Sequence, residues 1–206
     1  MESYSSNNSS FLQTEIRKIK IIRNAGMGLF IGMFFLCYGF FFYVFLDKWT
    51  ATSDKLPFFY KSLPLLSTLF FYFGILFGGL SWAVYAKNQK FIIALRDLNT
   101  HDLAIYQQYT QRLVRIYASI APYLFREHEL VFFPFWGSKK IPVSQIHRIE
   151  TKIIRNHRGP NSFRIYFYNE FSKIHQVTMN QRGAFDFLQE QLLEENPNLS
   201  IISINH

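Results

Sequence analysis

The sequence contains two long stretches without charge. No Asp, Glu, Lys, Arg or His occurs from Ala25 to Leu46 or from Ser62 to Ala86. At 1.5 Å per residue, the first stretch forms a helix of about 33 Å, close to the roughly 30 Å hydrocarbon core of a bilayer. A soluble domain usually has about 25% charged residues, whereas this chain of 206 residues has 17%. The sequence therefore predicts transmembrane helices over residues 25–46 and 65–86, followed by one soluble domain.

Cysteine is almost absent, because Cys37 is the single one and lies in the first apolar stretch. An intramolecular disulfide is therefore excluded. The common enzyme patterns are also missing, including a glycine-rich phosphate loop, Gly-x-Ser-x-Gly and His-Glu-x-x-His. No two of the six histidines are three or four residues apart, the spacing of helical zinc sites. We predict that the protein is not an enzyme and holds no metal and no cofactor.

Positive charge flanks the two apolar stretches. The chain has 22 Lys and Arg against 14 Asp and Glu, a net charge of +8. The flanking basic residues are Arg17, Lys18, Lys20 and Arg23 before the first stretch, and Lys87, Lys90 and Arg96 after the second. Under the positive-inside rule both flanks are cytoplasmic. The sequence thus predicts an integral protein of the cytoplasmic membrane, with both termini in the cytoplasm and residues 47–64 as a short extracytoplasmic loop.

Residues 1–24 combine two kinds of sequence. Met1 to Ser10 is rich in Ser and Asn and lacks an apolar period, which predicts a disordered tail. From Phe11 onward, apolar residues recur at helical spacing with basic residues between them. This favours a basic amphipathic helix that lies at the lipid headgroups or leads directly into the first span.

Glycines recur four residues apart in both predicted spans. The pairs are Gly28 with Gly32, and Gly74 with Gly78. Each pair opens a flat surface for a close helix contact. The simpler interpretation is the intramolecular seam of the hairpin, which would leave the many Phe side chains facing lipid or sister chains. An oligomer interface is the alternative. Because no ionisable residue lies inside the spans, a single copy is not expected to transport charged solutes.

The apolar period changes after the second span. Residues 87–121 continue at steps of three and four, which predicts a helical neck with Thr100 or Asp102 capping its second helix. From Pro122 the period is two, which predicts strands. These strands are expected as two within 123–136 around a turn at 127–129, then at 147–154, 163–168, 174–179 and 199–204. A helix from Gln181 to Glu195 is expected to bury Ala184, Phe185, Leu188 and Leu192. The predicted fold class is therefore membrane α+β: a two-helix hairpin, a helical neck, and a small antiparallel β-domain over 122–206 that the helix closes.

One segment carries a family resemblance. Lys140-Ile141-Pro142-Val143-Ser144-Gln145-Ile146 precedes the strand 147–154, and a helix follows at 182–193. This resembles the bacterial PH-like domains of small membrane proteins, including the YcxB-like group, over about residues 122–197. In that family an Ile-Pro-x-x-x-Ile segment lies between strands, Pro and Ser start a turn, and the last Ile enters the barrel. The resemblance implies a PH-like module that contacts lipid or protein and has no catalytic residues.

Basic residues gather around the predicted strands of this domain. The candidate contact set is Lys139, Lys140, Arg148, Lys152, Arg155, Arg158 and Arg164. Three interpretations stay open: a solvated strand face, a contact with anionic lipid or a protein partner, and a site for a phosphate-bearing ligand. Nucleic acid is not expected, because the patch is small and lies close to a repelling anionic bilayer.

These observations predict a membrane-tethered scaffold or interaction protein at the cytoplasmic membrane face. Its expected partners are membrane lipids and either a protein partner or further copies of the same chain. The alternative is an oligomeric two-span membrane effector that a nucleotide second messenger gates through the same basic residues.

Overall fold

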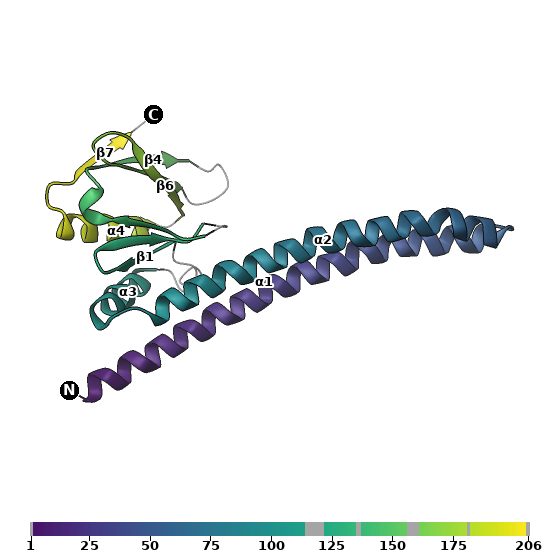
Figure 1. The fold of residues 1–206 in the computed structure, drawn as a ribbon, viewed down its shortest axis with the longest axis horizontal. Coiled ribbons are helices and arrows are strands. Elements are labelled where there is room, and N and C mark those ends of the chain that lie inside the picture. Colours follow the sequence, from purple (N-terminus) through teal and green to yellow (C-terminus); the bar gives the residue numbers. More distant parts are fainter. Residues whose placement is uncertain (1, 114–121, 135–136, 156–160, 181, 205–206) are drawn as a thin grey trace. The chain divides into compact units, whose positions relative to one another are not determined.

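The computed structural model describes residues 2–113, 122–134, 137–155, 161–180 and 182–204 (Figure 1). The chain divides into two compact units, Arg17–Gln89 on the one hand and Met1–Ile16 with Lys90–His206 on the other. The predicted soluble domain therefore shares its unit with the first residues of the chain and with the end of the second long helix.

Two long helices precede the strands. Helix α1 is Glu2–Ala51 and helix α2 is Lys55–Arg96. Both are long and apolar enough to cross a membrane, with mean hydropathies of 2.3 and 1.8 over their most apolar windows. Only residues 52–54 separate them, so the helices extend well into the predicted loop 47–64. Helix α1 also includes residues 2–10, where the sequence predicts a disordered tail.

Aromatic side chains form the seam of the hairpin within residues 17–89, where the two helices run antiparallel (Figure 1). Ring pairs along it are Phe34–Phe70, Tyr38–Phe70, Phe41–Phe73, Phe45–Phe58 and Trp49–Phe59, with centroids 5.2 to 5.8 Å apart. Positions 34, 38, 41 and 45 follow the alternating steps of four and three that keep one stripe of a helix against a partner. Part of the Phe content therefore packs inside the hairpin and does not face outward as predicted.

The predicted glycine seam is wrong. A Cβ atom added at any of the four glycines would meet nothing within 4 Å; these are Gly28, Gly32, Gly74 and Gly78. At Gly26, by contrast, it would lie 3.3 Å from Val84 Cγ1. The spacing of the glycines defines a face of each helix, but the larger aromatic stripe determines which face meets the partner.

Two sheets follow. The first is antiparallel, in the order β1-β2-β3, and the second is four-stranded, in the order β6-β5-β4-β7. The strands are β1 Tyr123–Arg126, β2 Glu129–Phe132, β3 Lys139–Pro142, β4 Arg148–Ile154, β5 Ser162–Tyr168, β6 Lys173–Met179 and β7 Ser200–Ile204; the helices are α3 Thr100–Arg112, the 3₁₀ turn η1 Val143–Gln145 and α4 Arg182–Glu195. Each strand expected from the period of two is present.

The second sheet is mixed, so the prediction of a wholly antiparallel domain is wrong. Strand β7 pairs with β4 in parallel, with Arg148 opposite Ser200. Strand β6 also runs parallel to β4, because β5 lies antiparallel to both. Two strands of the same direction need a crossover between them, and α4 supplies it between β6 and β7.

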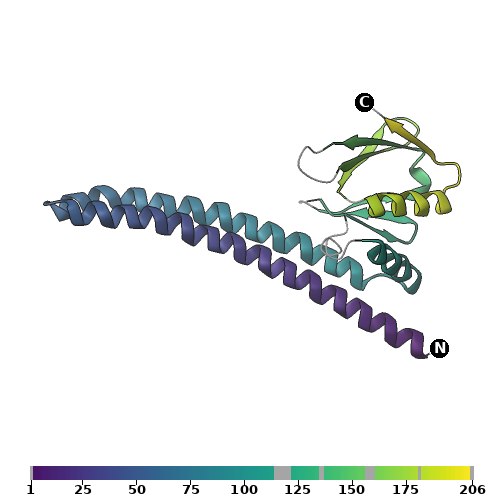
Figure 2. The same cartoon turned by 180° about the vertical axis from the view of Figure 1, so that it is seen from behind.

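The core lies between the two sheets. Phe132 of β2 contacts Phe167 of β5 at 5.4 Å between ring centroids. Helix α4 covers one opening between the sheets (Figure 2), and its Ala184 carbonyl oxygen accepts a hydrogen bond from the Tyr123 hydroxyl at 3.1 Å. Ile146, directly after η1, is fully buried.

Helix α4 buries a slightly different face from the one predicted. Ala184, Leu188 and Leu192 are buried as expected, but the fourth buried residue is Phe187. Phe185 is half-buried and stacks on Phe163. Phe187 instead faces α3, where its ring lies 5.6 Å from that of Tyr109.

The predicted helical neck is interrupted. Helix α2 ends at Arg96, and α3 begins at Thr100 with Asn99 as its N-cap. The Asn99 side-chain oxygen accepts a hydrogen bond from the Asp102 backbone N–H at 2.8 Å, so neither Thr100 nor Asp102 is the cap. Residues 114–121 of the predicted neck lie outside the described ranges.

Candidate functional site

The outer face of the four-stranded sheet carries three of the seven predicted basic residues, Arg148, Lys152 and Arg164. Side chains alternate along β4 and β5, and Ile149, Ile165 and Phe167 point into the core. The intervening residues therefore share the opposite face. We call this set the outer sheet face: Arg148, Glu150 and Lys152 of β4, Arg164, Tyr166 and Tyr168 of β5, and Lys173 and Gln176 of β6.

Lys152 and Arg164 lie directly opposite each other in the β4–β5 register. Like charges in this position destabilise a sheet. Neither side chain forms an ion pair with a described residue. The Arg164 Nε atom is buried and has no hydrogen-bond partner among the described residues. Two cations thus lie side by side on this face without an acidic partner among the described residues.

Arg148 is in a different electrostatic state. Its Nη2 atom lies 3.3 Å from Glu150 Oε1, and its guanidinium carbon lies 4.5 Å from the centroid of the Tyr168 ring. A hydrogen bond to Glu150 raises the pKa of the Tyr168 hydroxyl. Arg148 is therefore held in place and locally neutralised, whereas Lys152 and Arg164 are not.

The remaining predicted contact residues do not join this pair. Lys139 and Lys140 belong to β3 of the other sheet. The Lys139 Nζ atom donates to the Ile174 carbonyl oxygen, and the Lys140 Nζ atom lies 3.7 Å from Glu129 Oε2. Arg155 is exposed just after β4. Arg158 lies outside the described residues. Lys139 and Lys140 therefore lie in a different sheet from β4, because η1 carries the chain from one sheet to the other between them.

Phe171 is an exposed aromatic residue that was not predicted from the sequence. It lies in the turn between β5 and β6, and 90% of it is exposed. The Asn169 side-chain oxygen accepts hydrogen bonds from the backbone N–H groups of Phe171 at 2.9 Å and Ser172 at 2.7 Å. The turn is therefore ordered and presents the ring outward. The sequence does contain a signal for this exposed ring, namely an aromatic residue inside a turn that begins with Asn.

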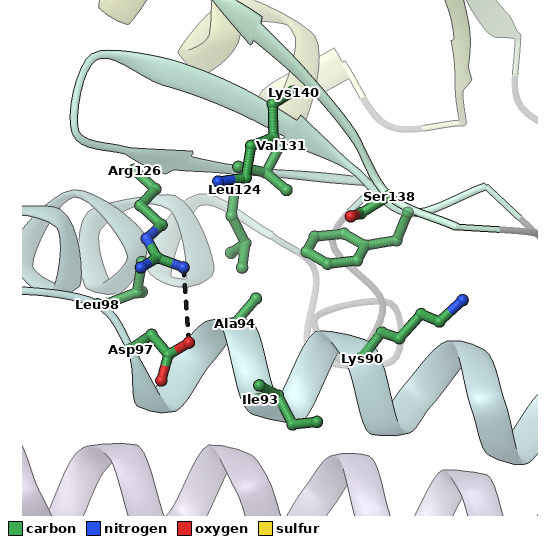
Figure 3. Close-up of a pocket in the computed structure, with 11 residues that line it drawn as sticks. Lys90, Ile93, Ala94, Asp97, Leu98, Leu124, Arg126, Val131, Ser138 and Lys140 are labelled. Carbon is green, nitrogen blue, oxygen red and sulfur yellow. Dashed lines mark ion pairs between the residues drawn. The ribbon is translucent and has the colours of Figure 1, made fainter.

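A cavity of about 210 Å³ lies beside the end of α2 (Figure 3). Its lining comes from α2 and the residues after it (Lys90, Ile93, Ala94, Asp97 and Leu98), from β1 and β2 (Leu124, Arg126 and Val131), and from Phe133, Ser138 and Lys140. We call it the α2 cavity. The cavity could not be predicted from local sequence patterns, because its walls come from segments about forty residues apart in the chain.

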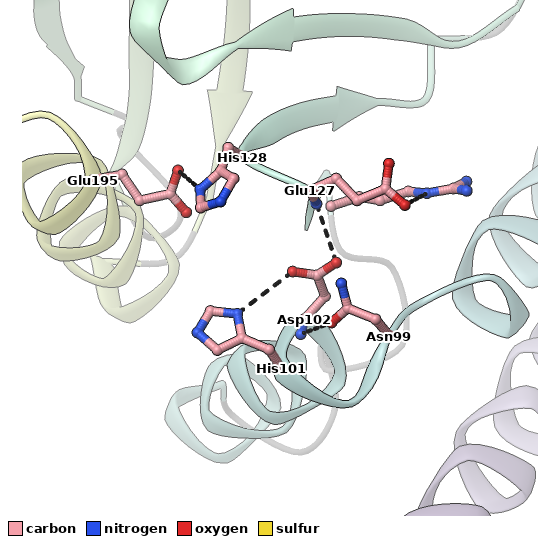
Figure 4. A network of polar contacts seen from close by, with 7 residues as sticks. Asn99, His101, Asp102, Glu127, His128 and Glu195 are labelled. Atoms are coloured by element: carbon pink, nitrogen blue, oxygen red, sulfur yellow. Dashed lines mark hydrogen bonds and ion pairs between the residues drawn. The ribbon is translucent and has the colours of Figure 1, made fainter.

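A buried carboxylate connects α3 to the turn between β1 and β2 (Figure 4). Asp102, only 4% exposed, accepts a hydrogen bond through Oδ2 from the Glu127 backbone N–H at 3.1 Å. Glu127 and His128 both have positive φ, 49° and 63°, a strained conformation for residues with a Cβ. His128 Nδ1 lies 3.3 Å from Glu195 Oε2 of α4. These contacts stabilise the turn between β1 and β2, so we assign them no catalytic or ligand-binding role.

Within the described ranges, no group of three or more His, Cys, Asp or Glu side chains could hold a metal ion. No family model, curated protein or solved structure matches the chain. A functional assignment therefore depends on the outer sheet face, the α2 cavity and the apolar hairpin.

Proposed function

We propose that this protein is a membrane-anchored interaction module whose PH-like β-domain contacts anionic lipid headgroups through Lys152 and Arg164. The observation that carries the proposal is the direct opposition of these two cations without an acidic partner among the described residues. The domain is tethered by two spans, at about residues 25–46 and 65–86, and both termini lie in the cytoplasm.

The surface of the hairpin supports the membrane anchor. Large apolar side chains are exposed along both helices, including Leu36 at 75%, Phe71 at 66% and Ile75 at 77%. Soluble monomers rarely expose continuous apolar surface of this extent. Lipid is the environment that such a surface requires, and the basic flanks favour the cytoplasmic side for both ends.

The order of elements supports the PH-like assignment. Two sheets face each other, one helix covers an opening between them, and the turn η1 is followed by the buried Ile146. Of these features, the buried Ile146 after the turn and the closing helix are those that the resemblance of residues 122–197 implies. Strand β7 adds a parallel edge strand beyond the helix.

Charge and surface aromatics support a lipid contact. Each basic residue near an anionic leaflet contributes about 1 kcal/mol, so Lys152 and Arg164 together contribute about 2 kcal/mol. The exposed Phe171 lies at the end of the same sheet, next to β5 and β6. Aromatic residues are favoured at the level of the headgroups.

The test uses the full-length protein in nanodiscs of either neutral or anionic phospholipid. Hydrogen exchange of the β4 and β5 amides is expected to be slower in the anionic discs. The double variant Lys152→Gln with Arg164→Gln is expected to lose this difference. Arg182→Gln removes an exposed cation of α4 and serves as the matched control that keeps it. Equal exchange in both kinds of disc would contradict the proposal.

Removing one of the opposed cations should also show how much the like-charge pair destabilises the domain. Lys152→Gln is expected to raise the thermal stability of the domain slightly, because a like-charge cross-strand pair disappears, while it weakens the lipid-dependent protection. A fall in stability would indicate that Lys152 has an internal partner and would remove the basis of the proposal.

The second candidate is an oligomeric effector gated by a phosphate-bearing nucleotide. The four glycines that meet nothing within 4 Å favour it, since they leave close-packing surfaces free for further copies. Native mass spectrometry in nanodiscs, with and without cyclic nucleotides, separates the two candidates. A closed ring or a nucleotide-dependent change of mass would favour the effector, and a monomer indifferent to every nucleotide would exclude it.

A further inference from the structure

We infer that the α2 cavity binds the acyl chain of an anionic amphiphile, with the acidic headgroup at its basic rim. The inference concerns a different surface from Lys152 and Arg164. It rests on the proposed function in one respect only, the membrane as the source of the ligand.

The inner walls of the α2 cavity are apolar. Leu124 and Val131 lie opposite each other in the β1–β2 register and point away from the face that carries Phe132. Both are nearly fully buried, at 2% and 4% exposed. Ala94 approaches from α2 (Figure 3). An unfilled apolar space beside well-buried side chains forfeits dispersion contacts, and an acyl segment would restore them.

The size of the cavity limits the ligand. Its volume of about 210 Å³ is below the roughly 300–1,000 Å³ typical of pockets that enclose a drug-sized molecule. It can hold a short acyl segment and cannot enclose a nucleotide. A longer chain would have to leave through the opening of the cavity.

Three basic side chains lie at the rim, and acidic side chains pair with two of them. Lys90, Arg126 and Lys140 line the cavity against one acidic residue, Asp97. The Arg126 Nη1 atom lies 3.6 Å from Asp97 Oδ2 (Figure 3) and the Lys140 Nζ atom 3.7 Å from Glu129 Oε2. Both separations exceed the normal range of a hydrogen bond. These ion pairs therefore leave donor capacity at the rim.

Two further donors are available there. Lys90 forms no ion pair with any residue in the described part of the chain. The Arg126 Nε atom lies 3.9 Å from Glu127 Oε1, too far for a hydrogen bond, and is buried without a hydrogen-bond partner among those residues. An acidic headgroup would satisfy them through charge-assisted hydrogen bonds, which are the strong ones. An uncharged headgroup would leave Lys90 without an ion-pair partner among the described residues.

Sequence position suggests where the ligand comes from. Lys90 follows Ala86, the end of the proposed second span, by four residues of the same helix α2. That separation is about one helical turn. A membrane lipid with an acidic headgroup and a fatty acid dissolved in water share the same chemistry, so the experiment separates these two sources.

The experiment uses full-length protein in neutral nanodiscs and two photoreactive probes. One is a water-soluble fatty acid with a diazirine near the end of its chain, and the other is a phosphatidic acid with the same group on one acyl chain. After illumination, mass spectrometry should locate adducts on the peptides that contain Leu124 and Val131. The methyl ester of the fatty acid probe should label them much less.

Two kinds of variant test the site. Val131→Trp fills the cavity and should abolish labelling; Ala94→Leu fills it from α2, in case the first variant does not fold. Lys90→Gln with Lys140→Gln should weaken binding about tenfold, because two charged donors are lost. Arg182→Gln is again the matched control and should label as the wild type does.

Each outcome has one meaning. Labelling by phosphatidic acid supports the inference with the membrane as source, and labelling by the free fatty acid alone supports it with a soluble source. Absence of cavity adducts with both probes, or unchanged labelling of both filled variants, would overturn it. Hydrogen exchange of β4 and β5 is measured separately on the same variants in anionic discs, so loss of the Lys152–Arg164 lipid contact and loss of the cavity site are recognised independently.

Discussion

His175 shows how one residue makes the β-domain sensitive to pH. Its ring lies 4.3 Å from that of Phe132, between the two sheets. Burial lowers the pKa of His175 below its ordinary value of 6.5, and the charge of Lys139 lowers it further. The folded state thus favours the neutral imidazole, whereas the unfolded state takes up a proton near pH 6.5. Stability from this group is complete above pH 6.5 and is lost as the pH falls towards the folded-state pKa.

The free energy of unfolding is therefore expected to be lower at pH 5 than at pH 7.5. In His175→Gln this part of the difference should disappear, which denaturant titration at several pH values measures. An unchanged pH dependence in His175→Gln would show that another group causes the effect.

At the scale of elements, the contact between α3 and α4 depends on the absence of a side chain. A Cβ atom at Gly183, in the first turn of α4, would lie 2.8 Å from the Arg112 carbonyl oxygen. Replacing Gly by Ala in a helix usually stabilises by about 0.5–1 kcal/mol. Gly183→Ala is expected to do the opposite and to cost about 1–3 kcal/mol, because the backbones must separate.

Thermal denaturation of the full-length protein measures this change. Gly79→Ala is the matched control, since a Cβ atom at Gly79 of α2 meets nothing within 4 Å. The control should melt at the same temperature as the wild type or higher. If both variants behave alike, α3 and α4 do not approach each other as closely as described.

The seam of the hairpin allows a similar comparison between two glycines of α1. Gly26→Leu should disturb the pairing of the helices, because Val84 Cγ1 lies 3.3 Å from the position of a Cβ atom. Gly28→Leu, two residues later, should not disturb it. Disulfide formation between cysteines introduced at positions 34 and 70, in a Cys37→Ala background, reports the pairing in nanodiscs. Equal effects of the two substitutions would contradict the assignment of the seam.

Local periodicity predicted the existence and type of most elements, including both strands around the turn at residues 127–129. It did not predict the direction of β7, because direction depends on how α4 crosses the sheet. Nor did it predict which helix face forms the seam. Gly28 and Gly32 define a possible contact face, but the larger burial along the Phe and Tyr stripe decides the rotation of the helix.

The candidate site was predictable only in part. Lys152 and Arg164 were both named from the sequence, yet their opposition depends on the β4–β5 register. Lys139 and Lys140 are close in sequence to β4 but belong to another sheet. The α2 cavity required tertiary structure, since Lys90 and Val131 meet there from distant segments.

At the scale of the whole molecule, the proposed anchor predicts a topology. Both termini should be cytoplasmic, and the short connection at residues 52–54 should face the other side. In a Cys37→Ala background, Ser53→Cys should react with a membrane-impermeant maleimide in intact cells. Ser144→Cys, exposed in η1, should react only after permeabilisation. Labelling of both sites in intact cells, or of neither, would contradict this topology.

The parallel pairing of β4 with β7 affects how the protein can be made. Strand β4 cannot pair with β7 until β7 has been translated, about fifty residues later. Domains fold as their residues leave the ribosome, so the hairpin of α1 and α2 emerges well before the four-stranded sheet can close. During that interval one edge of β4 has unpaired backbone groups, which can pair with other chains. A nascent chain already anchored in the bilayer would meet few competing strands, so early insertion would protect this sheet while it is completed.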